Sequence, residues 1–311
     1  MNESPAASSP PDPKRFRRAV EYHGARTLVY CLSLLPLSVA SWIGRRLGDV
    51  ARIFDRRHRE RAMQQVSERL GLGPEEARAF VKRNFRNYGM SLAEFARLRR
   101  MRAHDFTRFI DMEEFGDCCR KILAENKGLI FITAHFGNWE WCNSMAAHFG
   151  FTGGSIARPL DNARLNEYVR SIREKNGLRI LDKLGAIRKA LGALKNNQLV
   201  GILIDQDAGH QGMMSPFLGK PASTLTIPVE LAMRTGAPLV VVGLRRGGTK
   251  GKRFTILHTR EPICANPDAD PDVEVHRILD TLNDELGKII MQAPDQWFWI
   301  HRRWKSEGLK K

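Results

Sequence analysis

A histidine and a glutamate with four residues between them are the first residues that point to chemistry. His135 and Glu140 lie in the segment TAHFGNWEW, residues 133–141. A histidine with an ordinary pKa of about 6.5 can take a proton from a hydroxyl at neutral pH, and a carboxylate bonded to its other ring nitrogen fixes the tautomer. No Ser or Cys follows immediately, so the nucleophile would be a hydroxyl of the substrate. The alternative is a solvent-facing histidine and a glutamate that only stabilises a helix N-terminus.

The elements around this pair place it at the end of a strand. Residues 129–132 (LIFI) are an apolar run typical of a buried strand. Asn138 is a good N-cap for a helix over residues 139–149. Ligands of open α/β sheets bind at the carboxyl ends of the strands, so we expect an active site here, with Gly137 and Asn138 in its loop.

Two further predicted strands end in residues that suit the same site. The strand at 154–157 is followed by Arg158, and the strand at 199–204 is followed by Asp205 and Gln206. An arginine fork suits a phosphate or the oxyanion of an acyl transfer, and Asp205 and Asp207 would bind that arginine or hold a loop. Structural ion pairs are the alternative for each of these residues. No metal-ligand motif accompanies them, so no metal is expected.

The order of predicted elements indicates the fold class. Strands alternate with helices, which predicts an α/β fold with a mixed, largely parallel central sheet flanked by helices. We expect a basic tail at 1–18, a helical membrane-associating region at 19–112 and an α/β core at 113–311 that forms one continuous domain with the preceding helices. The other predicted helices cover residues 74–100, 114–126, 163–175, 187–194, 224–235 and 272–291, and the other strands 178–181, 239–244 and 254–257.

The N-terminal region carries the signals for a membrane surface. Residues 1–18 are rich in Pro and Ser and then basic, which is typical of a disordered tail. Residues 27–44 carry no formal charge, but Pro36 and several serines interrupt them, which makes a membrane span a borderline case. We therefore predict a membrane-associated hairpin or amphipathic helix pair, with a single span as the second alternative and a buried helix broken at Pro36 as the third.

The charge balance predicts an anionic partner. The chain holds 50 Lys and Arg against 34 Asp and Glu, a formal charge of +16. Such an excess fits a membrane surface, a phosphorylated substrate, an acidic protein or nucleic acid. No nucleic-acid-binding motif is present, so nucleic acid is not expected, and the basic run at residues 52–62 fits anionic lipid. Five cysteines without a C-x-x-C motif indicate reduced thiols and the cytosolic side of a membrane.

Several stretches together resemble a known family. They are TAHFGNWEW (133–141), NFRNYGMSLAEFARL (84–98), ARPLDN (157–162), DQDAG (205–209), FLGKPASTLTIPVELAMRTGAPLV (217–240) and PDQWFWIHRRWK (294–305). The sequence resembles the bacterial lipid A biosynthesis acyltransferases, the lauroyl/myristoyl transferase family within the lysophospholipid-acyltransferase group. The resemblance covers residues 28–305, and its most specific part is the H-x-x-x-x-D/E signature at His135 and Glu140.

The resemblance implies a function and roles for the site residues. It implies an enzyme on the cytoplasmic face of the bacterial inner membrane, monotopic or single-pass and without a cofactor. The enzyme would move a fatty acyl chain from acyl carrier protein, or from acyl-CoA, to a hydroxyl of a phosphorylated lipid A precursor. His135 would be the general base and Glu140 its orienting acid. The residues that would support the substrate or the oxyanion are Arg158, Asp205, Gln206, Asn138 and Gly137.

Alternatives to this function follow from the same residues. The same chemistry on another bacterial glycolipid, such as an inositol mannoside, fits equally well. A different class is a non-catalytic basic protein of the membrane surface, which would keep its binding after loss of His135 and Glu140. Met213 and Met214 are either part of an acyl channel or core filler.

Overall fold

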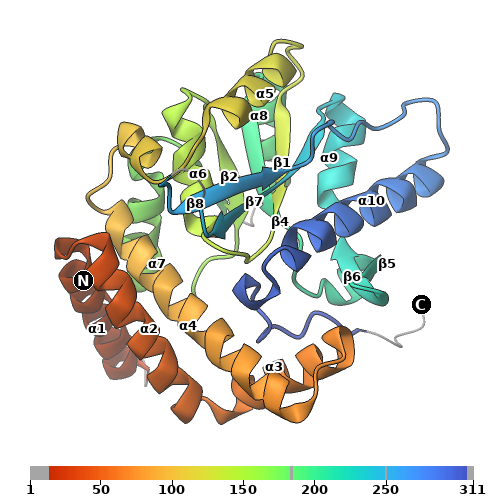
Figure 1. Ribbon diagram of the computed structural model, residues 1–311. Helices are drawn as coiled ribbons and strands as arrows, with labels where there is room; N and C mark the ends of the chain where they lie inside the picture. Colours follow the sequence, from red (N-terminus) through yellow and green to blue (C-terminus); the bar gives the residue numbers. More distant parts are fainter. Residues whose placement is uncertain (1–13, 183–184, 249–250, 307–311) are drawn as a thin grey trace, which may run out of the picture.

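The central sheet confirms the predicted fold class. The structure is a computed structural model that describes residues 14–182, 185–248 and 251–306. The six strands of the sheet have the order β3-β2-β4-β1-β7-β8 (Figure 1). The first five are parallel, and β8 pairs antiparallel with β7 at one edge. The strand bounds are β1 Leu129–Thr133, β2 Gly153–Ala157, β3 Arg179–Asp182, β4 Leu199–Leu203, β7 Leu239–Arg246 and β8 Phe254–His258.

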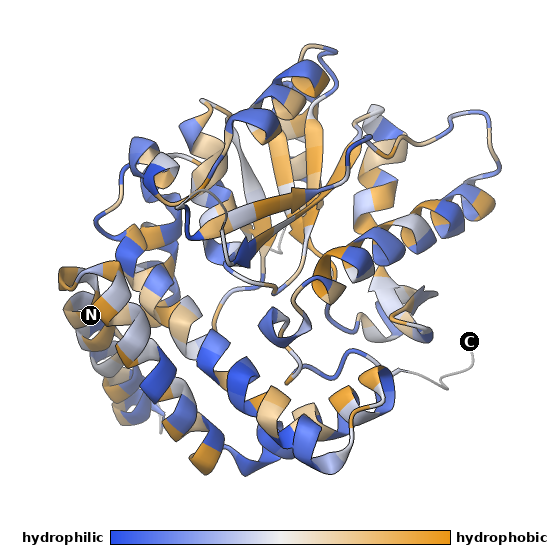
Figure 2. Cartoon of the chain, in the orientation of Figure 1, coloured by the Kyte–Doolittle hydropathy of each residue, from blue (hydrophilic) through white to orange (hydrophobic). Residues whose placement is uncertain are grey.

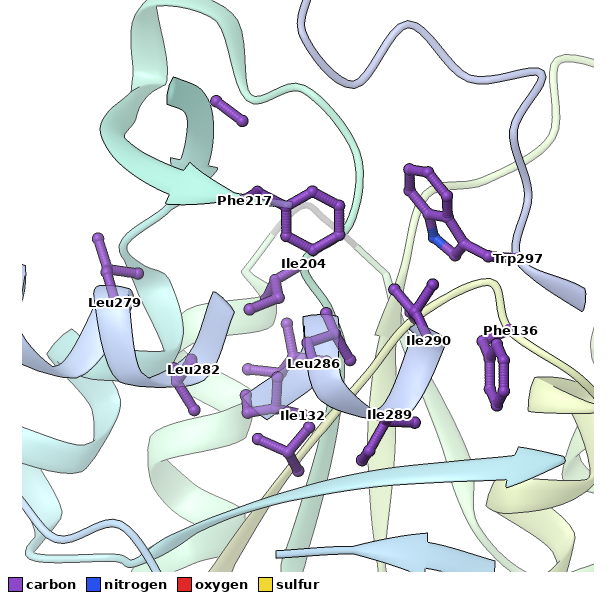
Figure 3. Packing of buried hydrophobic residues seen from close by; sticks show 14 of the residues in the cluster. Ile132, Phe136, Ile204, Phe217, Leu279, Leu282, Leu286, Ile289, Ile290 and Trp297 are labelled. Carbon is purple, nitrogen blue, oxygen red and sulfur yellow. The ribbon is translucent and has the colours of Figure 1, made fainter. Parts of the chain in front are cut away.

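Helices cover both faces of the sheet, because its central strands are apolar on both sides. Leu129 and Phe131 of β1 face one cluster, which includes residues of α5 Glu113–Leu123, α6 Trp139–His148 and α7 Ala163–Arg173. Ile130 and Ile132 face the other, with α8 Ala186–Lys195, α9 Ile227–Thr235 and α10 Pro271–Met291. Figure 3 shows the α10 side chains packed against this second face. Figure 2 shows the strands among the most hydrophobic parts of the chain.

Four N-terminal helices pack beside this core: α1 Arg15–Leu34, α2 Leu37–Phe54, α3 Arg56–Leu70 and α4 Pro74–Leu98 (Figure 1). Helices α2 and α4 meet backbone to backbone. A Cβ atom built on Gly48 would lie 2.2 Å from the carbonyl oxygen of Phe85, and one on Gly89 would lie 1.8 Å from that of Gly44. Small residues at such a crossing allow close helix contact. Only glycine therefore fits these positions without moving a helix.

The uncharged segment at residues 27–44 forms parts of two helices. Helix α1 ends at Leu34 and α2 begins at Leu37, with Pro36 as its N-cap. Within the residues that the structure describes, no helix is long and apolar enough to cross a membrane. Each helix buries one side and exposes large hydrophobic residues on the other. The exposed ones are Phe16, Val20, Tyr30 and Leu34 in α1, and Val39, Trp42, Val50, Ile53 and Phe54 in α2.

Two local predictions differ from the structure. The predicted helix at 224–235 begins only at Ile227, because residues 220–225 form strand β6 Lys220–Leu225, which pairs with β5 Gly212–Phe217. The turn between them uses Leu218 and Gly219, both with positive φ, as tight hairpins require. Residues 1–13 of the predicted disordered tail lie outside the described residues, whereas residues 15–18 already belong to α1.

Candidate active site

Strand register brings His135 and Asp205 together. Strands β1 and β4 are neighbours, and Thr133 pairs with Leu203 at their carboxyl ends. His135 and Asp205 each follow two residues later. The Nδ1 atom of His135 lies 2.9 Å from Oδ1 of Asp205, and the backbone N–H of His135 donates to Oδ2 at 2.9 Å. The carboxylate therefore holds both the ring and the main chain of the histidine.

Asp205 is an ionised group inside the protein. Its side chain is fully buried, and the indole Nε1–H of Trp297 donates to its Oδ2 at 2.9 Å. Burial by itself raises the pKa of Asp205, but the charge and hydrogen bonds of His135 outweigh it and hold the pKa below the usual range. A carboxylate at Nδ1 favours the tautomer with a proton there, which leaves Nε2 of His135 as the basic nitrogen.

Three other rings surround the His135 imidazole. The ring centroids of Trp139, Phe298 and His301 lie 5.4, 5.8 and 5.0 Å from that of His135. The Nε2 atoms of His301 and Gln206 are 3.0 Å apart. Burial lowers the pKa of His301 to about 4, and the charge of His135 acts in the same direction. His301 is therefore neutral at pH 7, and the His135 side chain remains 20% exposed.

Glu140 has a different partner from the predicted one. Its two carboxylate oxygens accept from Nε and Nη2 of Arg173 at 2.8 and 2.5 Å. Burial lowers the pKa of Arg173, but Glu140 outweighs this and raises it. The prediction that Glu140 orients His135 is corrected, because the register places Asp205 at the ring while the first turn of α6 directs Glu140 to the end of α7.

Arg158 makes no hydrogen bond or ion pair with His135 or Asp205 among the residues that the structure describes. It follows β2, whereas Asp205 follows the neighbouring strand β4 and His135 follows β1, one strand further. Arg158 lines a small pocket together with Arg170 and Arg173. Of the two roles predicted for Asp205, the pair with an arginine is not formed, since Asp205 binds His135 and Trp297. The other role agrees with the structure, because Asp205 holds the loop after β1 through the backbone N–H of His135. Through Arg173, the pocket lies next to Glu140.

Gly137 and Asn138 shape the loop after His135. Gly137 has φ +56°, and a Cβ atom there would lie 1.9 Å from the carbonyl oxygen of Leu244. Its N–H donates to the oxygen of Gln296 at 3.0 Å, and the N–H of Asn138 donates to Leu244 at 2.8 Å. Neither amide is thus free to bind an oxyanion. The predicted N-cap is confirmed, because Oδ1 of Asn138 accepts from the Trp141 N–H at 3.3 Å.

The C-terminal segment supplies site residues that sequence reasoning missed. Trp297, Phe298 and His301 all lie within PDQWFWIHRRWK, which the sequence singles out without indicating their contacts. Asn84 of α4 donates to the backbone oxygens of Asp295 and Trp297 at 2.8 and 2.7 Å. These bonds seat the segment beside β1 and β4. The one signal in the sequence was the aromatic and basic composition of this run.

The two methionines that the sequence suggests for an acyl channel or as core filler lie on β5. Met213 is half-buried and packs against the core cluster on the α10 side, and Met214, next to it on β5, is also half-buried.

Metal ligands are the other feature to check at such a site. Over the described residues, no three His, Cys, Asp or Glu side chains are grouped as metal ligands usually are.

The match to a family model decides what kind of protein this is. The model described as "Bacterial lipid A biosynthesis acyltransferase" matches residues 15–306, nearly the whole chain. The chain belongs to this family. The protein is therefore an acyltransferase, and the non-catalytic alternative is set aside.

Named relatives agree with this assignment. The chain is 29% identical over 289 residues to the lipid A biosynthesis lauroyltransferase of Escherichia coli (strain K12), covering 88% of this chain and 87% of the relative. It is 26% identical over 283 residues to the lipid A biosynthesis palmitoleoyltransferase of the same strain, with the same coverage. A phosphatidylinositol mannoside acyltransferase of Mycobacterium tuberculosis (strain CDC 1551 / Oshkosh) is 25% identical over 226 residues, 71% of this chain and 69% of the relative.

Proposed function

We propose that this acyltransferase moves a fatty acyl chain from acyl carrier protein to a free hydroxyl of a lipid A precursor, with His135 as the general base. The observation that carries the mechanism is the hydrogen bond between Nδ1 of His135 and the buried carboxylate of Asp205. This is the arrangement that makes an imidazole a base for an alcohol. No side chain of the enzyme needs to be the nucleophile, because the acceptor lipid brings its own hydroxyl.

The proposed reaction has two steps. Nε2 of His135 removes the hydroxyl proton as the acceptor oxygen attacks the thioester carbonyl, and a tetrahedral oxyanion forms. The C–S bond then breaks, and the imidazolium returns the proton to the leaving thiolate. Asp205 stabilises the imidazolium between the two steps, as the aspartate does in a catalytic triad.

The first turn of α6 supports stabilisation of the oxyanion. The N–H groups of Trp139 and Glu140 begin this helix and have no acceptor within it. Trp139 also packs against the His135 ring. A helix N-terminus favours negative charge, so these amides replace that of Gly137 as the proposed donors. Arg158, with Arg170 and Arg173, is the proposed contact for a phosphate of a substrate.

The surface of α1 and α2 supports work at a bilayer. Exposed Trp42 and Phe54 share these two helices with exposed arginines, including Arg45 and Arg46. Amphipathic helices of this kind lie in the membrane interface, and basic residues add attraction to anionic lipid. The enzyme would thus sit as a monotopic protein on the cytoplasmic face of the bacterial inner membrane. The charge of +16 fits this surface and both anionic substrates.

A second acceptor is supported by one comparison. The match to a phosphatidylinositol mannoside acyltransferase favours an inositol mannoside as the alternative glycolipid. The same His135 mechanism would serve that acceptor, since only the alcohol changes.

The test is an acyl-transfer assay with purified enzyme, acyl carrier protein loaded with chains of graded length, and either glycolipid in detergent. We expect transfer to the lipid A precursor and a loss of at least about 10³-fold in kcat for His135→Ala. Near-normal turnover by His135→Ala would refute the base assignment. Transfer only to the inositol mannoside would refute the acceptor. Mass spectrometry of lipid A from a deletion strain gives an independent check, because one secondary acyl chain should be missing.

A further inference from the structure

A cluster of cationic side chains lies where α3 meets the C-terminal segment. We call it the α3 patch: Arg57 and Arg61 of α3, and Arg302 of the C-terminal segment. Arg57 and Arg61 lie one turn apart on α3, and Arg61 reaches the backbone oxygen of Ile300, two residues before Arg302. Burial lowers the pKa of Arg61, and the charges of Arg302 and Arg57 act in the same direction. Arg57 and Arg302 are exposed, and neither forms an ion pair with any residue that the structure describes. Such a cluster leaves positive charge for an external anion to neutralise.

In space, His301 lies between the patch and the proposed base, His135. Arg61 donates to the backbone oxygen of Ile300 at 3.0 Å, and Gln65, one turn further along α3, donates to that of His301 at 2.8 Å. The His301 ring in turn lies 5.0 Å from that of His135, measured between centroids. Figure 1 shows α3 beside the C-terminal segment. A partner bound to the patch would therefore sit next to the site of acyl transfer.

The α3 patch differs in its exposed residues from the surface of α1 and α2, which is proposed to face the bilayer. The exposed large hydrophobic residues of α1 and α2 end at Phe54, and the next one along the described chain is Leu160. Helix α3 and the C-terminal segment at 294–306 contain none. A surface that inserts into lipid mixes cationic and apolar side chains, whereas the α3 patch is cationic and polar. It suits a hydrophilic, acidic macromolecule.

We propose that the α3 patch is the docking surface for the acidic carrier protein that delivers the acyl chain. This inference rests on the proposed function, which makes acyl carrier protein the donor. A carrier that presents its thioester on a flexible arm has to bind beside the base, and opposite charges speed and orient such an encounter. The patch contributes to binding of the donor protein and takes no part in bond making.

The test uses the full-length enzyme with the double variant Arg57→Glu/Arg302→Glu. The matched control is Arg234→Glu, an exposed arginine in the last turn of α9, which precedes the amino end of β7. Turnover is measured with the acceptor in non-ionic detergent and two donors carrying the same acyl chain, acyl carrier protein and acyl-pantetheine. We expect KM for the carrier-bound donor to rise about 10- to 100-fold in the double variant, with kcat within about threefold. KM for acyl-pantetheine should not change, and Arg234→Glu should match the wild type with both donors.

Three results would overturn the proposal. Equal KM for the carrier-bound donor in wild type and double variant would show that the patch does not bind the carrier. Equal rises for both donors would place the arginines in the binding site of the small donor. Loss of binding to anionic vesicles by the double variant, with an unchanged KM for the carrier, would assign the patch to lipid. If the wild type itself fails with acyl carrier protein but works with acyl-CoA, the proposed donor is wrong as well, and the wild-type assay alone reveals this.

Discussion

At the carboxyl end of the sheet, polar side chains point inward and several partners hold each one, whereas in α1 and α2 large apolar side chains point outward. Asp205 accepts three hydrogen bonds, two from His135 and one from Trp297. Close by, Arg246 binds both oxygens of the buried Glu94 and the hydroxyl of Ser91. Helix α2, by contrast, makes its inner contact through Gly44 and Gly48 and exposes Trp42, Ile53 and Phe54.

The difference shows which environment each region requires. Buried polar groups are stable when they are hydrogen-bonded, and the protein itself supplies the partners of the Asp205 carboxylate. The exposed aromatic and aliphatic side chains of two neighbouring helices have no packing partner within the part of the chain that the structure describes. Large apolar surfaces of this kind mark an interaction with another phase or molecule. Substitutions should therefore affect catalysis in the first region and lipid binding in the second.

The largest effect is expected for Asp205→Asn. An amide can hold His135 in the wrong tautomer, so kcat should fall about 10³- to 10⁴-fold, as it does when a triad aspartate is replaced. Steady-state kinetics with both substrates give the measurement. Asp207→Asn is the matched control, because this carboxylate in the same loop binds Ser306 at 2.9 Å. Similar losses in the two variants would mean that the loop as a whole, and not the contact with His135, is responsible.

Next comes Gly48→Ala, which tests the contact between α2 and α4. The new methyl group would lie 2.2 Å from the carbonyl oxygen of Phe85, so the helices must separate, and the free energy of unfolding should drop by about 2–4 kcal/mol. Gly24→Ala in α1 is the control, since a Cβ atom there meets nothing within 4 Å. It should raise the same free energy by up to about 1 kcal/mol through helix propensity. Urea denaturation measures both, and an unchanged midpoint for Gly48→Ala would disprove the close packing.

The double variant Trp42→Glu/Ile53→Glu tests the outward face of α2. Both side chains are more than half exposed, so the melting temperature should stay the same, while binding to anionic vesicles should weaken about 10- to 100-fold. Vesicle co-sedimentation and thermal melting give the two readouts. Val273→Glu, at an exposed position of α10, should change neither. If the double variant still binds vesicles as the wild type does, the outward face of α2 does not bind the membrane.

A smaller effect is expected for Trp297→Phe. The substitution keeps an aromatic ring but removes the indole N–H that donates to Oδ2 of Asp205 at 2.9 Å. Loss of one hydrogen bond to a buried carboxylate should lower kcat about tenfold and leave KM nearly unchanged. Trp299→Phe is the comparison, because that indole donates to Pro294 and not to Asp205. Equal losses of kcat would point to general packing of the segment.

The smallest effect concerns pH and His301. Because its pKa is about 4 in the folded protein and about 6.5 in the unfolded chain, the unfolded state takes up the proton first as the pH falls. The stability that neutral His301 contributes is thus present above pH 6.5 and lost between about pH 6.5 and 4, a change on the order of 1–3 kcal/mol. His301→Gln should flatten the stability profile in this window, measured by denaturation at each pH. A profile identical to that of the wild type would contradict a half-buried, neutral His301.

The sequence predicted those features of the site that depend only on residues close together in the chain. The apolar run before His135, the N-cap at Asn138 and the strand before Asp205 are all present as expected. The partner of His135 was not predictable, because it depends on which strands are neighbours and on their register. Glu140 is close in sequence but turns to Arg173, while Asp205 is distant in sequence and lies next to the ring.

The contribution of the C-terminal segment was hidden for a similar reason. Its path is set by Asn84 and Asn87 of α4, whose side chains donate to backbone oxygens more than 200 positions away. Such long-range bonds leave no periodic trace in the sequence. The helix break at Pro36 could be predicted directly, since proline restricts its own backbone and that of the preceding residue.

The pairing of Thr133 with Leu203 has a consequence for how the enzyme loses activity. Central strands of a sheet exchange their amide protons mainly through global unfolding, because no smaller opening exposes them. His135 and Asp205 are each tethered two residues beyond such a pair, so thermal fluctuations of nearby loops cannot easily separate them. The remaining activity of a heated sample, assayed with a soluble acceptor, should therefore fall in step with deuterium uptake at β1 and β4.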